Sequence, residues 1–133
     1  MSNTERVMKV MVVEDEELLR RMMQRALRRG GYEMVGASTG AQAMELAKAH
    51  DDVEVIVIDR GLPGLDGVTV ARALSQHYPG VKVVLMSGLV DESMKRAGEE
   101  VGAYRILEKP FRPRTLLEIL ESVRTSSARW SVA

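Results

Sequence analysis

The chain has 133 residues, close to the length of one typical domain, and its 45% hydrophobic residues are too many for a disordered tail. The 19 Lys and Arg residues balance 19 Asp and Glu residues, giving a net charge of +0, and only 4% of residues are aromatic; both features argue against direct binding of nucleic acid. The absence of cysteine excludes disulfide scaffolds, cysteine-based zinc sites, iron–sulfur clusters and thiol catalysis.

The two ends of the chain are predicted to be short polar tails, over 1–6 and 125–133, around one domain over 7–124. The first tail has no apolar core of the kind that a signal peptide needs, and the second carries Trp130. No aliphatic run exceeds about four residues, whereas a membrane span needs about 18. We therefore expect a cytoplasmic protein with no membrane partner.

Two kinds of apolar pattern alternate along the chain. Short, continuous, mostly β-branched runs indicate buried strands, and shorter, more polar runs indicate edge strands. The predicted strands cover 10–13, 33–37, 55–58, 83–86 and 104–107, with the second and fifth at the edges. Apolar residues at three- and four-residue spacing predict helices from Leu18 to Leu27, over 40–49 with Ser38 or Thr39 as N-cap, and over 67–77, 91–101 and 114–124.

Five strands alternating with five helices predict an α/β fold, with helices on both faces of a parallel sheet. Right-handed crossovers, with the first, third and fourth strands in the centre, give a doubly wound sheet in the order 2-1-3-4-5. In such sheets, ligands bind at the carboxyl ends of strands, where the chain changes direction across the sheet. The residues at those ends are therefore the candidate site residues.

Acidic residues follow two strands that are neighbours in this order. Glu14 and Asp15 follow the first strand, and Asp59 ends the third. Two like charges about 4 Å apart repel by about 4 kcal/mol at an effective dielectric near 20, so three carboxylates need a proton or a cation between them. Hard oxygen ligands without cysteine or a nearby histidine favour Mg²⁺ or Mn²⁺.

Two further residues complement the acids at the same edge of the sheet. Ser87 follows the fourth strand and offers a hydroxyl donor, and Lys109 follows the fifth and offers a cation. A carboxylate can attack phosphorus to form an aspartyl-phosphate, and phosphoryl transfer needs mainly positioning and charge neutralisation. The central position of Asp59 makes it the candidate nucleophile, while Glu14 and Asp15 hold the metal.

At this point the residues resemble a known family, the response-regulator receiver domains of two-component signalling. The resemblance covers about 7–124 and implies the flavodoxin-like fold of the chemotaxis regulators. No single matching segment is specific, but all four occur in order and at the expected strand ends: Glu14-Asp15, the loop over 59–67 (DRGLPGLDG), Ser87-Gly88 and Lys109-Pro110-Phe111.

The resemblance implies that Asp59 accepts a phosphoryl group from a phosphohistidine on a histidine kinase or histidine phosphotransfer protein. It implies Mg²⁺ bound by Asp15, Asp59 and the carbonyl of Gly61, with Glu14 helping directly or through water. Ser87 and Lys109 then bond the phosphoryl oxygens, and Lys109-Pro110 is similar to the family's usual cis-peptide pair. The output is another protein or domain, so the chain is either a stand-alone regulator or the receiver of a hybrid histidine kinase.

The predicted switch departs from the family pattern. Three residues before the lysine, the family usually has Tyr or Phe, which moves inward together with the hydroxyl residue, here Ser87; this chain has Ile106. Tyr104 lies two residues earlier and is expected to share a face of the strand with Ile106. We therefore expect the aromatic gate to be absent, with Tyr104 at most a partial substitute.

The first helix offers two surfaces with different expected roles. Leu19 and Met22 lie one turn apart near the site, and are either core or a docking patch for a kinase's helices; the resemblance favours docking, aided by Pro110 and Phe111. A solvated face is expected for the arginines of this helix: Arg20, Arg21, Arg25, Arg28 and Arg29.

Other hypotheses stay open beside this one. An aspartyl-phosphate phosphatase also uses Mg²⁺ and a carboxylate nucleophile, and Glu17 stands two residues beyond Asp15 as its acid would, but the chain has no insertion to cover a substrate. A receiver-shaped interaction module without phosphorylation is a second alternative. A flavin-binding protein is disfavoured, because the acidic loop after the first strand would repel the flavin phosphate. We expect no enzyme activity beyond self-phosphotransfer and slow self-dephosphorylation.

Overall fold

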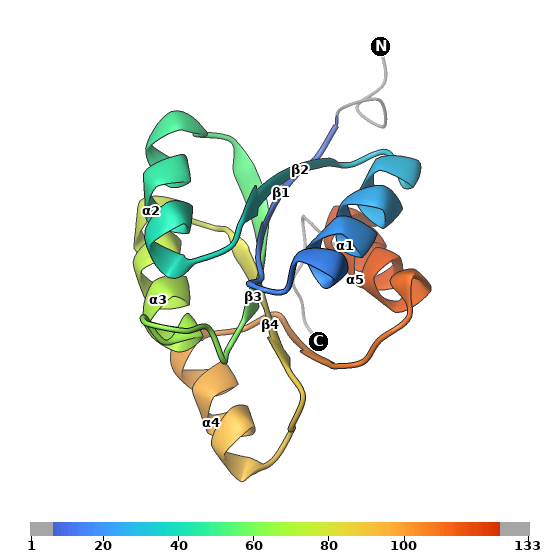
Figure 1. The fold of residues 1–133 in the computed structure, drawn as a ribbon. Helices are drawn as coiled ribbons and strands as arrows, with labels where there is room; N and C mark the ends of the chain where they lie inside the picture. Colours follow the sequence, from blue (N-terminus) through green and yellow to red (C-terminus); the bar gives the residue numbers. More distant parts are fainter. Residues whose placement is uncertain (1–6, 126–133) are drawn as a thin grey trace.

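The computed structural model describes residues 7–125 as a five-stranded parallel sheet between two layers of helices (Figure 1). The strand order is β2-β1-β3-β4-β5, as predicted. Residues 1–6 and 126–133, which include Trp130 and most of the two predicted tails, lie outside the described residues. The strands are β1 (Lys9–Val13), β2 (Glu33–Ala37), β3 (Val53–Asp59), β4 (Lys82–Ser87) and β5 (Arg105–Glu108).

The helices divide between the two faces of the sheet: α1 and α5 cover one face, and α2, α3 and α4 cover the other (Figure 1). None of the helices within residues 7–125 is long and apolar enough to cross a membrane. The helix bounds are α1 (Glu17–Arg29), α2 (Gly40–Ala49), α3 (Gly67–His77), α4 (Glu92–Val101) and α5 (Pro113–Thr125). The last helix extends one residue beyond its predicted bounds of 114–124 at each end.

Side chains alternate between two cores along each strand. On β3, Val55 and Val57 pack on the side of α1 and α5, whereas Ile56 and Ile58 pack on the side of α2, α3 and α4. Because β1, β3 and β4 are buried on both faces, they read as continuous apolar runs, which is why the sequence identified them.

Local polar contacts fix two of the helix starts. Thr39, one of the two predicted caps of α2, accepts the backbone N–H of Gln42 on its hydroxyl oxygen at 3.0 Å. Asp91 caps α4 in the same way, accepting the N–H of Met94 at 3.0 Å. These caps satisfy helix N–H groups that have no partner inside the helix, and so hold the helix starts next to the carboxyl ends of the strands.

The start of β5 corrects one prediction from the sequence: Tyr104 and Ile106 do not share a face of the sheet. β5 begins at Arg105, so Tyr104 precedes the extended segment to which two-residue alternation applies. Ile106 lies against Gly98 of α4, whereas Tyr104 packs on the opposite core and its hydroxyl forms a 2.8 Å hydrogen bond with the hydroxyl of Ser122 on α5. Tyr104 is therefore not a substitute for an aromatic side chain at position 106.

A close backbone contact determines where α3 begins. The N–H of Gly67 donates to the carbonyl of Arg60 at 3.0 Å, which closes the loop after β3. A Cβ atom at Gly67 would lie 2.7 Å from the Cα of Arg60 and closer still to the carbonyl oxygen of Asp59. Only glycine allows the backbone of α3 to approach the end of β3 this closely.

We expect Gly67→Ala to lower the free energy of unfolding by about 3 kcal/mol, because overpacking against backbone atoms cannot be relieved by a side-chain rotation. Urea denaturation followed by circular dichroism measures the change. Gly88→Ala is the matched control, since a Cβ atom there meets nothing within 4 Å. Equal midpoints for the two variants would contradict the importance of the Gly67 contact.

Candidate functional site

The predicted acidic residues meet at the carboxyl end of the sheet. Glu14 and Asp15 follow β1, and Asp59 is the last residue of β3. Side chains alternate between the two faces along each strand. By this alternation, Glu14 and Asp59 lie on the same side of the sheet as Val12 and Val57. One carboxylate oxygen from each of the three acids lies within 4.8 Å of the others.

The ammonium group of Lys109 bridges two of these acids. Its Nζ lies 2.9 Å from Glu14 Oε1 and 3.0 Å from Asp59 Oδ2. Lys109 follows β5, and its backbone N–H donates to the carbonyl of Ser87 at 2.8 Å, which sets where the side chain begins. The peptide bond between Lys109 and Pro110 is cis, as the resemblance implied. Residues far apart in the sequence are thus joined in one charged cluster.

Glu14 is buried, with 1% of its surface exposed, and is held from several directions. Its Oε2 accepts the backbone N–H of Glu16 at 3.0 Å, and its carbonyl accepts a hydrogen bond from Arg20 at 2.7 Å. Burial raises the pKa of the Glu14 carboxyl, and the nearby Asp59 charge acts in the same direction, while the hydrogen bonds from Glu16 and Lys109 oppose them. A cation close to Glu14 therefore stabilises its charged form.

The pKa of Lys109 is raised by the acids around it. Partial burial acts to lower this pKa, but the hydrogen bonds to Glu14 and Asp59 and their negative charges outweigh it. Lys109 is therefore positively charged at neutral pH, and its three N–H donors are available to anionic oxygens.

The charges and donor atoms of the cluster fit a hard divalent cation. Three carboxyl groups and one amino group meet at this end of the sheet, so the formal negative charges outnumber the positive one by two. Asp15 is exposed, so the cluster opens to solvent on one side. The donors are carboxylate oxygens, the ligands that Mg²⁺ prefers. The residues present therefore fit the metal that the sequence predicts.

Gly61 and Ser87 lie beside this cluster. The backbone N–H of Gly61 donates to Asp59 Oδ1 at 3.1 Å and so fixes the other oxygen of that carboxylate. Ser87 ends β4, next to β3 in the sheet. Its hydroxyl group donates to the carbonyl of Leu89 at 2.9 Å and accepts the N–H of the same residue at 3.1 Å. Ser87 therefore lies at the site, but its hydroxyl is hydrogen-bonded to the backbone of the loop that follows β4.

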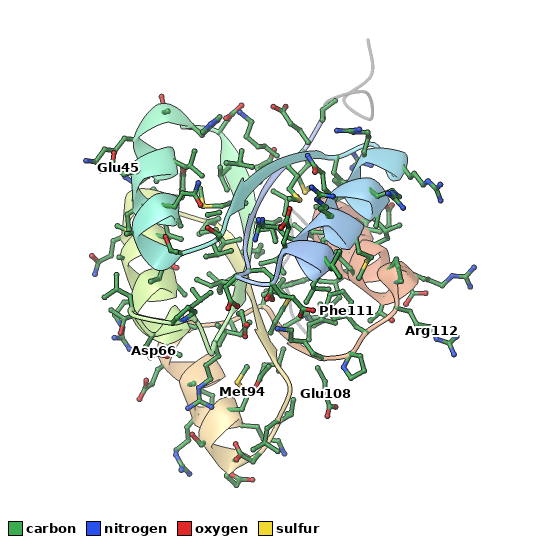
Figure 2. The ribbon with its side chains drawn as sticks, viewed as in Figure 1. Glu45, Asp66, Met94, Glu108, Phe111 and Arg112 are labelled. Atoms are coloured by element: carbon green, nitrogen blue, oxygen red, sulfur yellow. The ribbon has the colours of Figure 1, made fainter. Side chains whose placement is uncertain are left out.

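An apolar hollow of about 480 Å³ adjoins the acidic cluster, and we call it the α1 hollow. The predicted docking residues Leu19, Met22, Pro110 and Phe111 all line it, and Phe111 reaches toward the start of α1 (Figure 2). Leu18 lines it too and is 74% exposed. The spacing of apolar residues did not distinguish these positions, because the apolar residues of α1 range from buried Met23 and Leu27 to exposed Leu18.

Arg60 is a residue near the site that the sequence analysis missed. It follows Asp59 directly, and its guanidinium donates to the hydroxyl oxygen of Ser93 on α4 at 2.8 Å and to the sulfur of Met94 at 3.7 Å. Its position next to the candidate nucleophile could have indicated a functional role. The sequence does not show, however, which distant residues an arginine in a loop contacts.

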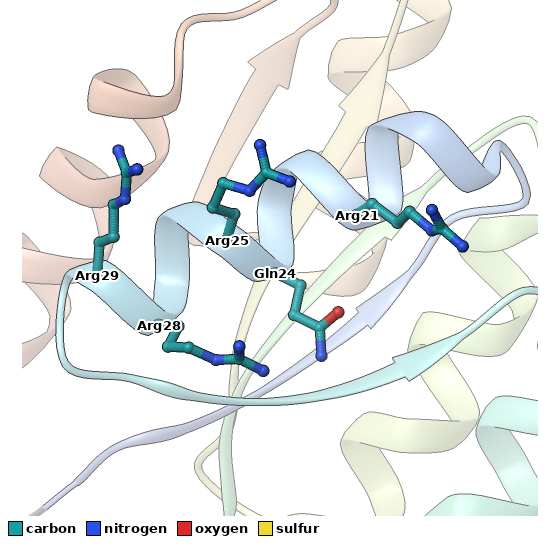
Figure 3. Close-up of a pocket in the computed structure, with 5 residues that line it drawn as sticks. All are labelled: Arg21, Gln24, Arg25, Arg28 and Arg29. Carbon is teal, nitrogen blue, oxygen red and sulfur yellow. The ribbon is translucent and has the colours of Figure 1, made fainter.

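The arginines of α1 form a separate surface. Arg21, Arg25, Arg28 and Arg29 project from the outer side of the helix, around a shallow hollow that also includes Gln24 (Figure 3). These four are exposed, as predicted. Arg20 differs, because it turns toward the end of β1 and binds the carbonyl of Glu14.

Comparison with known proteins agrees with this geometry. The family model described as response regulator receiver domain matches residues 10–121. The chain is 36% identical over 106 residues to the alkaline phosphatase synthesis transcriptional regulatory protein PhoP of Bacillus subtilis, which covers 80% of this chain and 44% of that protein. It is 32% identical over 108 residues to the transcriptional regulatory protein SrrA of Staphylococcus aureus, which covers 81% of this chain and 44% of that protein. The chain thus spans less than half the length of these relatives.

Two solved structures match over nearly their whole length. The chemotaxis protein CheY4 of Vibrio cholerae superposes with a TM-score of 0.83 at 30% identity, covering 89% of this chain and 99% of that one. The signal receiver domain of an HD domain-containing protein from Pseudomonas fluorescens superposes with a TM-score of 0.84 at 25% identity, covering 93% of this chain and 100% of that one. The predicted flavodoxin-like class is confirmed. With the family model matching most of its length, the chain belongs to the response regulator receiver domain family.

Proposed function

We propose that this chain is the phosphoacceptor of a two-component phosphorelay, and that Asp59 is the residue phosphorylated. The observation that supports this function is that both oxygens of the Asp59 carboxylate are hydrogen-bonded. One oxygen accepts from the Lys109 ammonium, and the other accepts from the backbone N–H of Gly61. This carboxylate ends a central strand, beside two more acids whose charge calls for a cation. A fixed carboxylate within a cation-binding cluster suits in-line attack on phosphorus.

The transfer forms one bond and breaks one. A carboxylate oxygen of Asp59 attacks the phosphorus of a partner's phosphohistidine, and the phosphorus–nitrogen bond breaks with its electron pair left on the imidazole, which takes up a proton. Lys109 donates hydrogen bonds to the phosphoryl oxygens, and Ser87 donates another when its hydroxyl turns from Leu89. Asp15, Asp59 and the carbonyl of Gly61 would hold Mg²⁺, with Glu14 alongside, and the bound ion would neutralise charge on those oxygens.

The α1 hollow is the proposed docking surface for the phosphodonor. It lies against Lys109, so a helix seated on Leu18, Leu19, Met22 and Phe111 is next to Asp59. Exposed apolar side chains next to a charged site are typical of interaction surfaces. The partner is a histidine kinase or a histidine phosphotransfer protein, whose histidine must reach the acidic cluster.

In this proposed function, the receiver acts as a cytoplasmic signalling module that modifies itself rather than as an enzyme with an external substrate. It makes no direct nucleic-acid contact of its own. PhoP and SrrA are named as transcriptional regulators, and this chain spans less than half of each. A stand-alone regulator and the receiver of a hybrid histidine kinase are both compatible with the site.

Incubation with acetyl phosphate and Mg²⁺ is expected to add one phosphoryl group to the wild type and none to Asp59→Asn, because only the ionised carboxylate attacks phosphorus. Intact-mass spectrometry measures the addition. Asp66→Asn, which removes an exposed acid from the same loop, is the control and is expected to be phosphorylated normally. Equal phosphorylation of Asp59→Asn would refute the assignment, and turnover of a small phosphate ester by that variant would favour the phosphatase alternative.

Magnesium is expected to raise the melting temperature of the wild type. At about ten times Kd, mass action adds about 1.4 kcal/mol, or about 5 °C for a domain of this size. Asp15→Asn should show well under half of this increment, because it loses a charged oxygen ligand. Glu17→Gln is the control, since Glu17 is exposed and pairs with Arg21 at 3.0 Å. An unchanged melting temperature in the wild type would favour an interaction module without phosphorylation.

Hydrolysis of the phosphorylated form is expected to be slow. Gly61 and Leu89, which flank Asp59 and Ser87, carry no polar side chain to orient an attacking water. The measurement is the decay of the phosphorylated mass after acetyl phosphate is removed in the presence of Mg²⁺. A half-life of seconds would contradict this expectation.

A further inference from the structure

Arg60 connects the residue next to Asp59 with the first turn of α4. Its Nη2 donates to Ser93 Oγ at 2.8 Å, and its Nη1 donates to Met94 Sδ at 3.7 Å. Met94 is fully buried, and Figure 2 shows it on α4 near this end of the sheet. The start of α4 is therefore tied to the loop that carries the phosphoacceptor.

The partners of the Arg60 guanidinium within the described part of the chain, Ser93 and Met94, are both neutral. Among residues 7–125, no carboxylate lies within ion-pair distance of it. Guanidinium groups bind carboxylate and phosphate more strongly than neutral acceptors, because the planar fork makes two parallel charge-assisted hydrogen bonds. A half-buried cation without an anionic partner, one residue from the phosphorylation site, is thus available to a new anion.

The backbone of Arg60 is fixed, so the side chain is the part that can move. Its N–H donates to the carbonyl of Met86 on β4 at 2.9 Å, and its carbonyl accepts the N–H of Gly67 at 3.0 Å. Ser93 is exposed, and its hydrogen bond to Arg60 can exchange with water. Leaving Ser93 therefore costs one hydrogen bond to a neutral acceptor, which is less than a guanidinium gains from an anionic oxygen.

An aromatic side chain in β5 is not available to make this connection. Ile106 offers only aliphatic contact with α4 near Gly98, and Tyr104 lies on the other face, bonded to Ser122. Another polar contact to α4, between Arg72 of α3 and Glu100, is exposed, with atoms 3.5 Å apart. Arg60 is the described side chain that joins the Asp59 loop to α4.

We propose that Arg60 is a second cation for the phosphoryl group, after Lys109, and that it transmits phosphorylation to α4. A phosphoryl group brings a charge of about −1.5 to −2 to Asp59, and the guanidinium leaves Ser93 and Met94 to bind its oxygens. The first turn of α4 then loses its anchor. This inference rests on the proposed function and adds the residue that couples the site to the helix.

Hydrogen exchange of the Met94 and Lys95 amides reports on the anchor, because both amides are bonded to Asp91 at the start of α4. Before phosphorylation, Arg60→Gln should lower their protection factors about five-fold, the effect of losing one hydrogen bond. Arg72→Gln is the matched control and should leave them unchanged, since it removes a contact near the other end of α4. Equal protection factors in Arg60→Gln and the wild type would overturn the proposal, and this comparison requires no phosphorylation.

Phosphorylation with acetyl phosphate and Mg²⁺ should lower the same protection factors in the wild type by a similar factor. Ser93→Asp gives the guanidinium an anion on α4 that competes with the phosphoryl group, so phosphorylation should no longer change the protection, although intact mass still shows the added group. A full wild-type response in Ser93→Asp would overturn the proposal. If the wild type is not phosphorylated, the proposed function is refuted instead. The comparison of unphosphorylated Arg60→Gln with the wild type would still decide whether Arg60 anchors α4.

Discussion

The bridge from the Lys109 ammonium to Glu14 and Asp59 is the interaction on which the functional end of this protein depends. It joins the ends of β1, β3 and β5, and it places a positive charge where two buried or nearly buried carboxylates would otherwise repel each other. One ammonium does not balance three acids, and Asp15 adds a further negative charge on the solvent side. The remaining negative charge favours a divalent cation at this end of the sheet.

The sheet supplies the rigidity that this arrangement needs. β1 and β3 are buried on both faces, so neither strand can shift without disturbing two cores at once. Gly67 closes the loop after Asp59 against the backbone, and Gly61 fixes the second oxygen of that carboxylate. The acidic cluster is therefore placed on fixed elements. In the adjoining α1 hollow, Leu18 is exposed, whereas Leu19, Met22 and Phe111 are half-buried.

The two faces of the sheet carry different connections from the site. On one side, Tyr104 is bonded to α5 through Ser122; on the other, Ile106 lies against α4. The family's aromatic position therefore holds an aliphatic side chain, and the contact between the Asp59 loop and α4 is made by the guanidinium of Arg60. A long cationic side chain responds to a new negative charge directly, whereas an aromatic ring responds to the space left by a moving hydroxyl.

Local patterns along the chain were sufficient to predict the order of elements, the sheet topology and the strand ends that carry the acids and the lysine. Those features follow from local apolar periodicity and from the rule that parallel strands present their carboxyl ends at one edge. Only the tertiary structure decided which side chains touch: that Arg60 reaches Ser93, that Leu18 is exposed and that Tyr104 faces α5. Side-chain partners depend on where a strand begins and on how far a helix extends past the sheet, and both are set by packing between distant segments rather than by local pattern.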